Sequence, residues 1–206
     1  MLDACTVEFL AAHPDATVLD LGCGLDDRRE RVDPPKDARW FDIDYPDVIA
    51  LRQRFYSETA GYQMIGASLT SPDFLHCIPM DRPAIIVADG LLPFLTEEEI
   101  KQLFRRLTAH FPGGQLAFNG YSRLASRLMV AHPSIKAIGI APANSGFDDP
   151  HEPETWDPHL KLIDAQSIIG SPYVARAPGT YRAICHLMYC VPALRKEGGW
   201  ILRYHF

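Results

Sequence analysis

The chain lacks the features that mark disulfide-stabilised, secreted and membrane-spanning proteins. Its five cysteines lie far apart without a CxxC pair, which disfavours a disulfide framework and a structural zinc site. No apolar run approaches the roughly 20 residues that span a bilayer. The N-terminal residues include Asp3, where a secretory signal requires positive charge. We therefore expect reduced cysteines, a cytoplasmic location and no membrane partner.

An excess of positive charge is also missing. The 26 Asp and Glu residues outnumber the 20 Lys and Arg residues, which gives a formal net charge of -6. The basic residues are scattered or lie beside acids, so we expect no nucleic-acid partner. What the chain has is 206 residues, 47% of them hydrophobic, without internal repeats. We predict a single domain over residues 1–206 with a substantial core.

Short apolar runs alternate with helical or turn segments. Because this alternation is typical of βαβ units, we expect an α/β fold with a mostly parallel sheet. A strong helix start is predicted at Thr96, an N-cap followed by three glutamates, and residues 111–114 should end that helix. The strands are predicted over 17–21, 39–43, 62–65, 84–88, 115–119, 160–164 and 200–206, further helices over 48–59, 122–138 and 180–194, and a long loop over 140–160.

A glycine pair directly follows the first predicted strand. Gly22 and Gly24 allow a tight turn and a closer approach to a ligand than a Cβ would permit. Asp44 follows Gly24 by 20 positions, where a carboxylate can accept hydrogen bonds from both hydroxyls of a ribose. Asp27 occupies the third glycine position of a dinucleotide loop, and an acid there would repel a pyrophosphate but not a cation. The pattern predicts a nucleoside-like ligand, and Asp27 would not repel a cationic one.

A purely structural interpretation of the same residues stays open. Gly22 and Gly24 would then form an ordinary βα turn, and Asp44 would cap a helix that begins at Pro46. Asp20 could form a hydrogen bond within the loop. The joint spacing of the glycines and Asp44 favours ligand binding.

Three ordered blocks carry a resemblance to a known family. They are residues 18–28 (VLDLGCGLDDR), residues 40–49 (WFDIDYPDVI) and residues 88–95 (ADGLLPFL). They resemble the G-x-G-L-D-x-R, D-x-P-x-V/I and E-G-L-x-x-Y-L motifs of the leucine carboxyl methyltransferase and polyketide O-methyltransferase family, with Asp89 and Phe94 replacing the glutamate and tyrosine of the third motif. Residues 146–156 are similar to a stretch of the polyketide-type members.

The resemblance implies a class I, Rossmann-like fold with a seven-stranded sheet, and S-adenosyl-L-methionine as cofactor. In the family the glycine loop lies against the methionine part, the acid before the proline holds the ribose, and a motif after the third strand contacts adenine. Ser68 stands where most members have aspartate. The cofactor-binding residues implied in this way are Asp20, Gly22, Cys23, Gly24, Asp44, Tyr45, Ser68, Leu69, Asp89 and Gly90.

Family members usually carry a long helical lid segment before the first strand, whereas residues 1–16 precede it here. We therefore expect a short N-terminal segment and assign no lid residue. The leading hypothesis is an O-methyltransferase acting on a carboxylate or hydroxyl of a small, for example polyketide-like, metabolite. The alternative is a lid-less member that binds the cofactor as a non-catalytic or partner-dependent module. A nucleotide-dependent oxidoreductase is disfavoured by Asp27.

Few residues are expected to act in catalysis, because methyl transfer from a sulfonium mainly requires alignment and the exclusion of water. No catalytic residue is assigned. Tyr121 and Arg123 follow the fifth strand, at the edge where substrates bind in open α/β sheets, and Arg123 could pair with a carboxylate acceptor. In the alternative interpretation, Ser122 caps the next helix and Arg123 is solvated.

The remaining polar groups of the second half carry no motif. We interpret His132, His151, His159 and His186 as surface or capping residues. The acids and histidines of the 140–160 loop, which we place on the acceptor side, lack regular ligand spacing, so no metal site is predicted. The apolar region 184–206 contains either a buried terminal strand or a homodimer contact.

Overall fold

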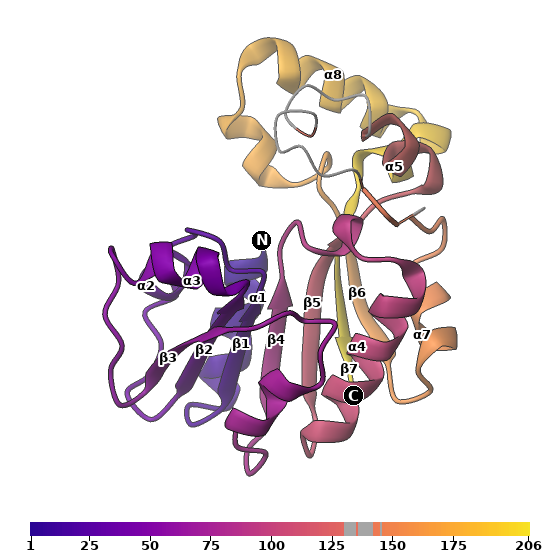
Figure 1. Ribbon diagram of the computed structural model, residues 1–206. Coiled ribbons are helices and arrows are strands. Elements are labelled where there is room, and N and C mark those ends of the chain that lie inside the picture. Colours follow the sequence, from indigo (N-terminus) through magenta and orange to yellow (C-terminus); the bar gives the residue numbers. More distant parts are fainter. Residues whose placement is uncertain (130–134, 136–141, 145) are drawn as a thin grey trace.

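A single sheet forms the centre of the molecule (Figure 1). The computed structural model describes residues 1–129, 135, 142–144 and 146–206, and within them seven strands pair in the order β3-β2-β1-β4-β5-β7-β6. Neighbours from β3 to β5 are parallel, and β7 is antiparallel to both β5 and β6. The expected mostly parallel α/β sheet is confirmed. Its strands are β1 (Thr17–Leu21), β2 (Arg39–Asp44), β3 (Tyr62–Gly66), β4 (Ala84–Ala88), β5 (Gly114–Gly120), β6 (Lys161–Ser167) and β7 (Trp200–His205).

The central strands are apolar on both faces because both faces are covered. Every residue of β1 and β4 is buried. Val18 and Ile85 point into one core, and their neighbours Leu19 and Ile86 point into the other. Parallel strands covered on both faces read as continuous apolar runs, which is why these two strands were visible in the sequence.

Three helices cover one face of the sheet: α1 (Leu2–Ala12), α2 (Arg28–Val32) and α3 (Pro46–Arg52). Phe9, Val32 and Ile49 pack with Trp40 of β2 in the core on this face. The sequence did not predict α1. The helix expected over 48–59 begins earlier, at a proline that suits a first turn, and ends at Arg52.

The opposite face is covered by η1 (Asp73–Cys77), α4 (Glu97–His110) and α7 (Glu152–Trp156), the last two in the foreground of Figure 1. The helix start predicted at Thr96 is confirmed, because Thr96 and Glu99 form a reciprocal capping box. The prediction of an unbroken loop over 140–160 was wrong, since α7 lies within it. Residues 140, 141 and 145 lie outside the described residues.

Four further elements gather beyond the carboxyl ends of the parallel strands, at the top of Figure 1: α5 (Arg123–Met129), η3 (Pro172–Arg176), α8 (Gly179–Cys190) and η4 (Pro192–Gly198). The helix predicted over 180–194 ends at Cys190. Of the one predicted over 122–138, residues 130–134 and 136–138 lie outside the described residues. No described helix is both long and apolar enough to cross a membrane.

Candidate active site

The glycine loop lies at the carboxyl end of β1, where the strand order reverses between β1 and β4. Gly22 and Gly24 both adopt left-handed backbone conformations, with φ of 66° and 53°. A Cβ at Gly22 would lie 3.1 Å from Leu91 Cδ1, whereas a Cβ at Gly24 would have no atom within 4 Å. The backbone N–H groups of Gly22 and Cys23 donate to the carbonyl of Ile43, which ties the loop to β2. The Cys23 side chain is buried, and burial raises its thiol pKa.

Asp44 connects the end of β2 with the glycine loop. One oxygen of its carboxylate accepts from the Gly24 N–H at 2.8 Å, and the other accepts from the Tyr45 N–H at 2.7 Å. The interpretation of Asp44 as a helix cap was wrong, because Tyr45 occupies the N-cap position of α3. The carboxylate is partly exposed. It faces the glycine loop, as the 20-residue spacing between Gly24 and Asp44 predicts.

A pocket opens beside Asp44, between the ends of β1, β2 and β3. The Ser68 hydroxyl is hydrogen-bonded to the Thr70 hydroxyl at 2.8 Å, so this wall is polar but uncharged. The Leu69 side chain is buried, and its carbonyl accepts from Arg106. The pocket is lined by Gly22, Asp44, Tyr45, Ala67, Ser68, Leu69, Thr70, Leu91 and Leu95.

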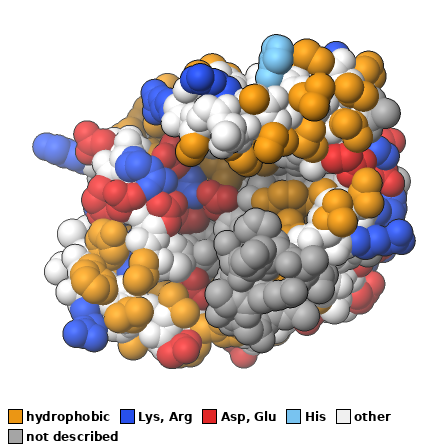
Figure 2. Space-filling view, turned by 90° about the horizontal axis from the view of Figure 1, so that it is seen from above, with side chains coloured by type: hydrophobic (Ala, Val, Ile, Leu, Met, Phe, Trp, Pro, Cys, Tyr) orange, Lys and Arg blue, Asp and Glu red, His pale blue; other side chains and the backbone are white. Residues whose placement is uncertain are grey.

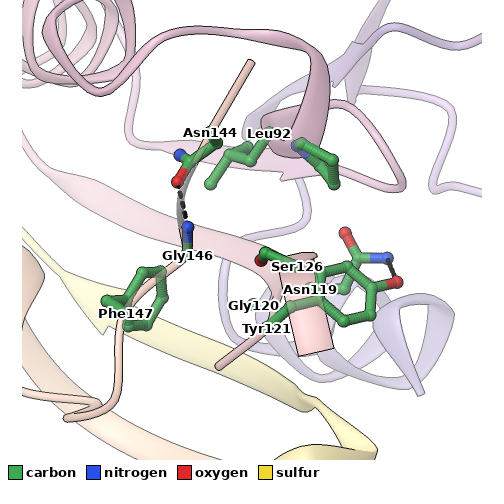
Figure 3. Close-up of a pocket in the computed structure, with 9 residues that line it drawn as sticks. Leu92, Asn119, Gly120, Tyr121, Ser126, Asn144, Gly146 and Phe147 are labelled. Carbon is green, nitrogen blue, oxygen red and sulfur yellow. Dashed lines mark hydrogen bonds between the residues drawn. The ribbon is translucent and has the colours of Figure 1, made fainter. Parts of the chain in front are cut away.

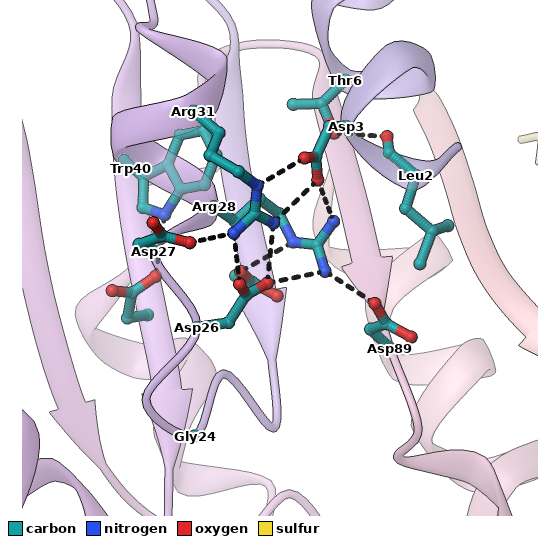
Figure 4. A network of polar contacts seen from close by, with 12 residues as sticks. Leu2, Asp3, Thr6, Gly24, Asp26, Asp27, Arg28, Arg31, Trp40 and Asp89 are labelled. Carbon is teal, nitrogen blue, oxygen red and sulfur yellow. Dashed lines mark hydrogen bonds and ion pairs between the residues drawn. The ribbon is translucent and has the colours of Figure 1, made fainter. Parts of the chain in front are cut away.

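An arginine that is 2% exposed organises the acids around the loop (Figure 4). Arg28 pairs with Asp3 at 2.5 Å, with Asp20 and Asp89 at 3.0 Å and with Asp26 at 3.1 Å. These acids come from α1, β1, the glycine loop and the end of β4. Burial raises the pKa of the Asp20 carboxyl to about 7, although the adjacent Arg28 guanidinium acts to lower it. The sequence did not indicate Asp3 as a member of this cluster.

A second arginine, Arg52, holds the backbone of the glycine loop. Arg52 of α3 and Asp42 of β2 form an ion pair of 2.6 Å in which both side chains are fully buried. The Arg52 guanidinium also donates to the carbonyls of Gly24 and Asp26, at 3.1 and 2.7 Å. Asp42 accepts further hydrogen bonds from the Trp40 indole and the Tyr62 hydroxyl. The glycine loop is therefore held in place before any ligand binds.

The Asn119 side chain, near the end of β5, connects the loop after β4 with Tyr121. The amide oxygen of Asn119 accepts from the Gly90 N–H at 2.9 Å. Its amide nitrogen donates to Asp89 at 3.1 Å and to the Tyr121 hydroxyl at 3.2 Å. Tyr121 then lines a small pocket with Leu92, Pro93 and Phe147, among others (Figure 3).

A larger cavity, of about 420 Å³, begins on the other side of Tyr121. It lies between α5 and η4, and its lining is mostly apolar apart from Glu197, which accepts a hydrogen bond from Ser122. In Figure 2, a group of acidic and basic side chains lies at the left of the hollowed face, and many hydrophobic side chains lie at its upper right. The lining residues are Tyr121, Ala125, Leu128, Met129, Ile135, Glu197 and Gly198.

Arg123 lies at the start of α5, and its guanidinium already has acidic partners. It is 2.8 Å from Glu152 and 3.7 Å from Asp148. Ser122 accepts from the Ala125 N–H, as an N-cap should. A role for Arg123 at the acceptor stays a prediction, and its pairing with these two acids argues against it.

Two histidines of the 140–160 segment each pair with an acid of the same segment, whereas Asp148 and Glu152 pair with Arg123. His151 lies 3.5 Å from Glu154, and His159 lies 2.8 Å from Asp157. Where the chain is described, no three potential ligands come close enough to hold a metal ion. His132 lies outside the described residues.

A sequence model of the leucine carboxyl methyltransferase family matches residues 1–108. The chain belongs to this family. The matched region contains the glycine loop, Asp44, the Ser68 wall and Asp89, which are the parts of the site that surround the end of β1. The matched residues end within α4, before β5 and the larger cavity.

Individual relatives are similar to the chain beyond residue 108, where the family match ends. The tetracenomycin polyketide synthesis O-methyltransferase TcmP of Streptomyces glaucescens is 40% identical over 205 residues, which cover 100% of this chain and 75% of TcmP. An S-adenosyl-L-methionine-dependent methyltransferase of Gibberella zeae is 33% identical over 183 residues, covering 82% of this chain and 61% of that protein. The chain thus spans less than two thirds of the second relative.

The fold is similar to that of an S-adenosylmethionine-dependent methyltransferase from Mesorhizobium loti, with a TM-score of 0.68 at 12% identity, covering 100% of this chain and 98% of that one. Together the comparisons identify the family member as an S-adenosylmethionine-dependent O-methyltransferase with a class I, Rossmann-like fold. They give no support to an oxidoreductase or to a non-catalytic module.

The residues at the carboxyl edge of the parallel strands fit S-adenosylmethionine. A Cβ built at Gly24 or at Gly90, which also has a positive φ of 68°, would project into space free of protein atoms. The surrounding side chains are acids, which suits a ligand that carries a sulfonium and an ammonium group. Both the open space and the charge lie at the reversal of strand order, the usual ligand position in open α/β sheets.

Proposed function

We propose that S-adenosylmethionine binds along the carboxyl ends of β1, β2 and β4, and that the methyl acceptor is a small, polyketide-like metabolite bound between Tyr121, α5 and η4. The observation that carries the first part is the Asp44 carboxylate, which faces the glycine loop and lines the adjacent pocket. The proposed cofactor-binding residues are Asp20, Gly22, Cys23, Gly24, Asp44, Tyr45, Ser68, Leu69, Asp89 and Gly90.

Each part of this edge has a distinct task. Asp44 accepts hydrogen bonds from the ribose hydroxyls, and the pocket by Ser68 and Leu69 receives the base. Asp89 and the acids around Arg28 provide negative potential for the cationic end. When bound, S-adenosylmethionine supplies an activated methyl group. The protein's own contribution is then to hold the acceptor oxygen in line and to exclude water.

The acceptor proposal rests on the apolar cavity lined by Tyr121 and on the similarity to TcmP, an O-methyltransferase of tetracenomycin polyketide synthesis. An apolar wall suits the rings of such a metabolite. A carboxylate or a hydroxyl would serve as the nucleophile, with Tyr121 beside it. Arg123 is a weaker candidate because Glu152 and Asp148 already neutralise it.

Partners and location are part of the same proposal. All five cysteines are described and free, which suits a reducing compartment such as the cytoplasm. Exposed apolar side chains on α8, including Ile184 and Leu187, suit a homodimer contact. The net charge of -6 argues against a nucleic-acid partner.

A calorimetric titration with S-adenosylmethionine and with S-adenosylhomocysteine tests cofactor binding. Asp44→Ala removes the ribose acceptor, so the dissociation constant should rise at least about 10-fold, equivalent to about 1.4 kcal/mol. The matched control is Asp47→Ala, which removes an exposed acid of α3 and should leave affinity unchanged. Equal affinity in wild type and Asp44→Ala would contradict the proposed site.

Transfer of a labelled methyl group to a panel of polycyclic aromatic carboxylates and phenols tests the acceptor. We expect transfer to at least one polycyclic compound and none to benzoate or phenol, which are too small to fill the cavity. Cofactor binding without transfer to any polycyclic compound would contradict the acceptor class but not the cofactor site.

A further inference from the structure

Asn119 joins the cofactor edge to the acceptor cavity through a single side chain. It lies near the end of β5, is 7% exposed, and uses both ends of its amide. The oxygen accepts from Gly90, and the nitrogen donates both to Asp89 and to Tyr121. An amide nitrogen carries two hydrogens, so its donor capacity is fully used. Asn119 therefore fixes where the Tyr121 hydroxyl lies relative to Asp89 and Gly90.

This contact also determines whether the Tyr121 hydroxyl can donate a hydrogen bond to a ligand. Because Asn119 donates to the phenolic oxygen, the hydroxyl hydrogen remains available to a different acceptor. Among the described residues, no other hydrogen bond to this hydroxyl is present. Burial, together with the nearby Asp89 and Tyr181, raises the pKa of the Tyr121 phenol above its usual value. The hydroxyl is therefore a neutral donor throughout the physiological pH range.

The position of Tyr121 makes that donor useful. The residue lines both the small pocket beside Leu92 (Figure 3) and the larger cavity beside Leu128. Its hydroxyl is linked to Asp89 at the proposed cofactor edge through the Asn119 amide. Its backbone carbonyl accepts from the Phe147 N–H at 3.0 Å. The residue is thus held from two directions, by Asn119 at the hydroxyl and by Phe147 at the backbone.

We infer that Asn119 is a positioning residue, which holds Tyr121 so that its hydroxyl donates a hydrogen bond to the nucleophilic oxygen of the methyl acceptor. This inference rests on the proposed function. The hydrogen bond occupies one lone pair of the acceptor oxygen and leaves another for the methyl group. The arrangement serves an acceptor oxygen that is already ionised, a carboxylate or a phenolate, because its attack on the methyl group releases neutral S-adenosylhomocysteine and leaves no proton to be removed.

Tyr121→Phe tests the donor by removing one oxygen atom. We expect kcat to fall about 10-fold or more, because an acceptor oxygen that is no longer held by the hydroxyl lies less often in line with the methyl group. The dissociation constant for S-adenosylhomocysteine and the midpoint of thermal unfolding should stay unchanged. The matched control is Tyr173→Phe, which alters an exposed tyrosine of η3 and should leave kcat unchanged. A kcat for Tyr121→Phe equal to that of wild type would overturn the inference.

A double-mutant cycle tests whether Asn119 acts through Tyr121. Asn119→Ala should lower kcat about as much as Tyr121→Phe does, with a smaller change in the KM of the acceptor. In the double variant, the loss should be close to that of one single variant, because both remove the same interaction. Losses that multiply would show that Asn119 acts independently of Tyr121 and would overturn the positioning role.

Asn119→Asp provides a second variant if the alanine variant is unstable. Its carboxylate still accepts from Gly90 but would draw the Tyr121 hydrogen toward itself, so kcat should again fall. Retention of full kcat would count against the inference. Failure of the proposed function has a different signature, since wild-type protein would then bind no cofactor or methylate no member of the acceptor panel.

Discussion

The two sides of the site differ in how they are built. On the donor side, which comprises the loops after β1, β2 and β4, buried arginines fix the carboxylates and the glycine loop. On the acceptor side, which comprises α5, α8 and η4, large apolar side chains are exposed, including Leu124, Leu128 and Leu187. If the proposed sites are right, the cofactor meets a charged surface that is already held in place, and the acceptor meets an apolar one.

The largest effect should come from breaking the buried pair below the glycine loop. Arg52→Met leaves Asp42 as a buried charge without its cation, so the free energy of unfolding should fall by about 3–5 kcal/mol. Urea denaturation measures the change. Arg39→Met, which breaks the partly exposed pair with Asp81, should cost at most about 1 kcal/mol. Equal losses in the two variants would show that the donor side is not prebuilt in the way described.

A glycine-to-alanine substitution on each side tests the difference between the donor and acceptor sides directly. Gly24→Ala places a side chain at a φ of 53°, so it should cost about 1–2 kcal/mol of unfolding free energy and weaken cofactor binding about 10-fold. Gly179→Ala, at the start of α8, meets no atom within 4 Å and should change neither quantity by a measurable amount. Calorimetry and urea denaturation together provide the readout. A cofactor affinity unaffected by Gly24→Ala would contradict the proposed role of the glycine loop and the difference between the two sides.

A smaller, pH-dependent effect is expected where α4 contacts the segment that leads to the acceptor side. Asp157 is buried, and although burial opposes the change, hydrogen bonds from Thr108 and His159 lower its pKa. A depressed pKa stabilises the fold above pH about 4, and this contribution is lost as the pH falls through the lowered value. Asp157→Asn should therefore cost about 1–2 kcal/mol at pH 7 and less at pH 3.

The control for that experiment is Asp15→Asn, an exposed acid whose replacement should have little effect at either pH. Urea denaturation at the two pH values measures both variants. A loss for Asp157→Asn that is the same at pH 7 and pH 3 would contradict the electrostatic explanation.

The smallest effect should appear on the acceptor side. Leu128→Gln removes an apolar contact from the cavity wall, so the KM of the acceptor should rise several-fold while cofactor affinity and stability stay unchanged. Leu51→Gln, an exposed leucine of α3 away from both pockets, should leave the KM unchanged. A cofactor affinity that changes with Leu128→Gln would show that the two sides are not separate.

The donor side was largely predictable because its signals are local. Two glycines after a strand and an acid 20 residues later are visible in the sequence, and in the structure Asp44 does contact Gly24. The contacts of Arg28 with Asp3 and Asp89 join residues 25 and 61 positions apart, and no local pattern reveals them. The helix α7 was missed because its proline was read as a breaker, although Pro153 lies in the first turn, where proline is tolerated.

The place of β7 in the sheet has a consequence for synthesis. It is made after β5 and β6, yet it lies between them in the sheet. Until residues 200–206 have emerged from the ribosome, β5 has an unpaired edge and β6 has no neighbour to join. The strands of the donor side can pair while the chain is still growing, whereas β6 and the free edge of β5 wait for β7. A nascent chain is therefore most exposed to wrong strand pairing at β5.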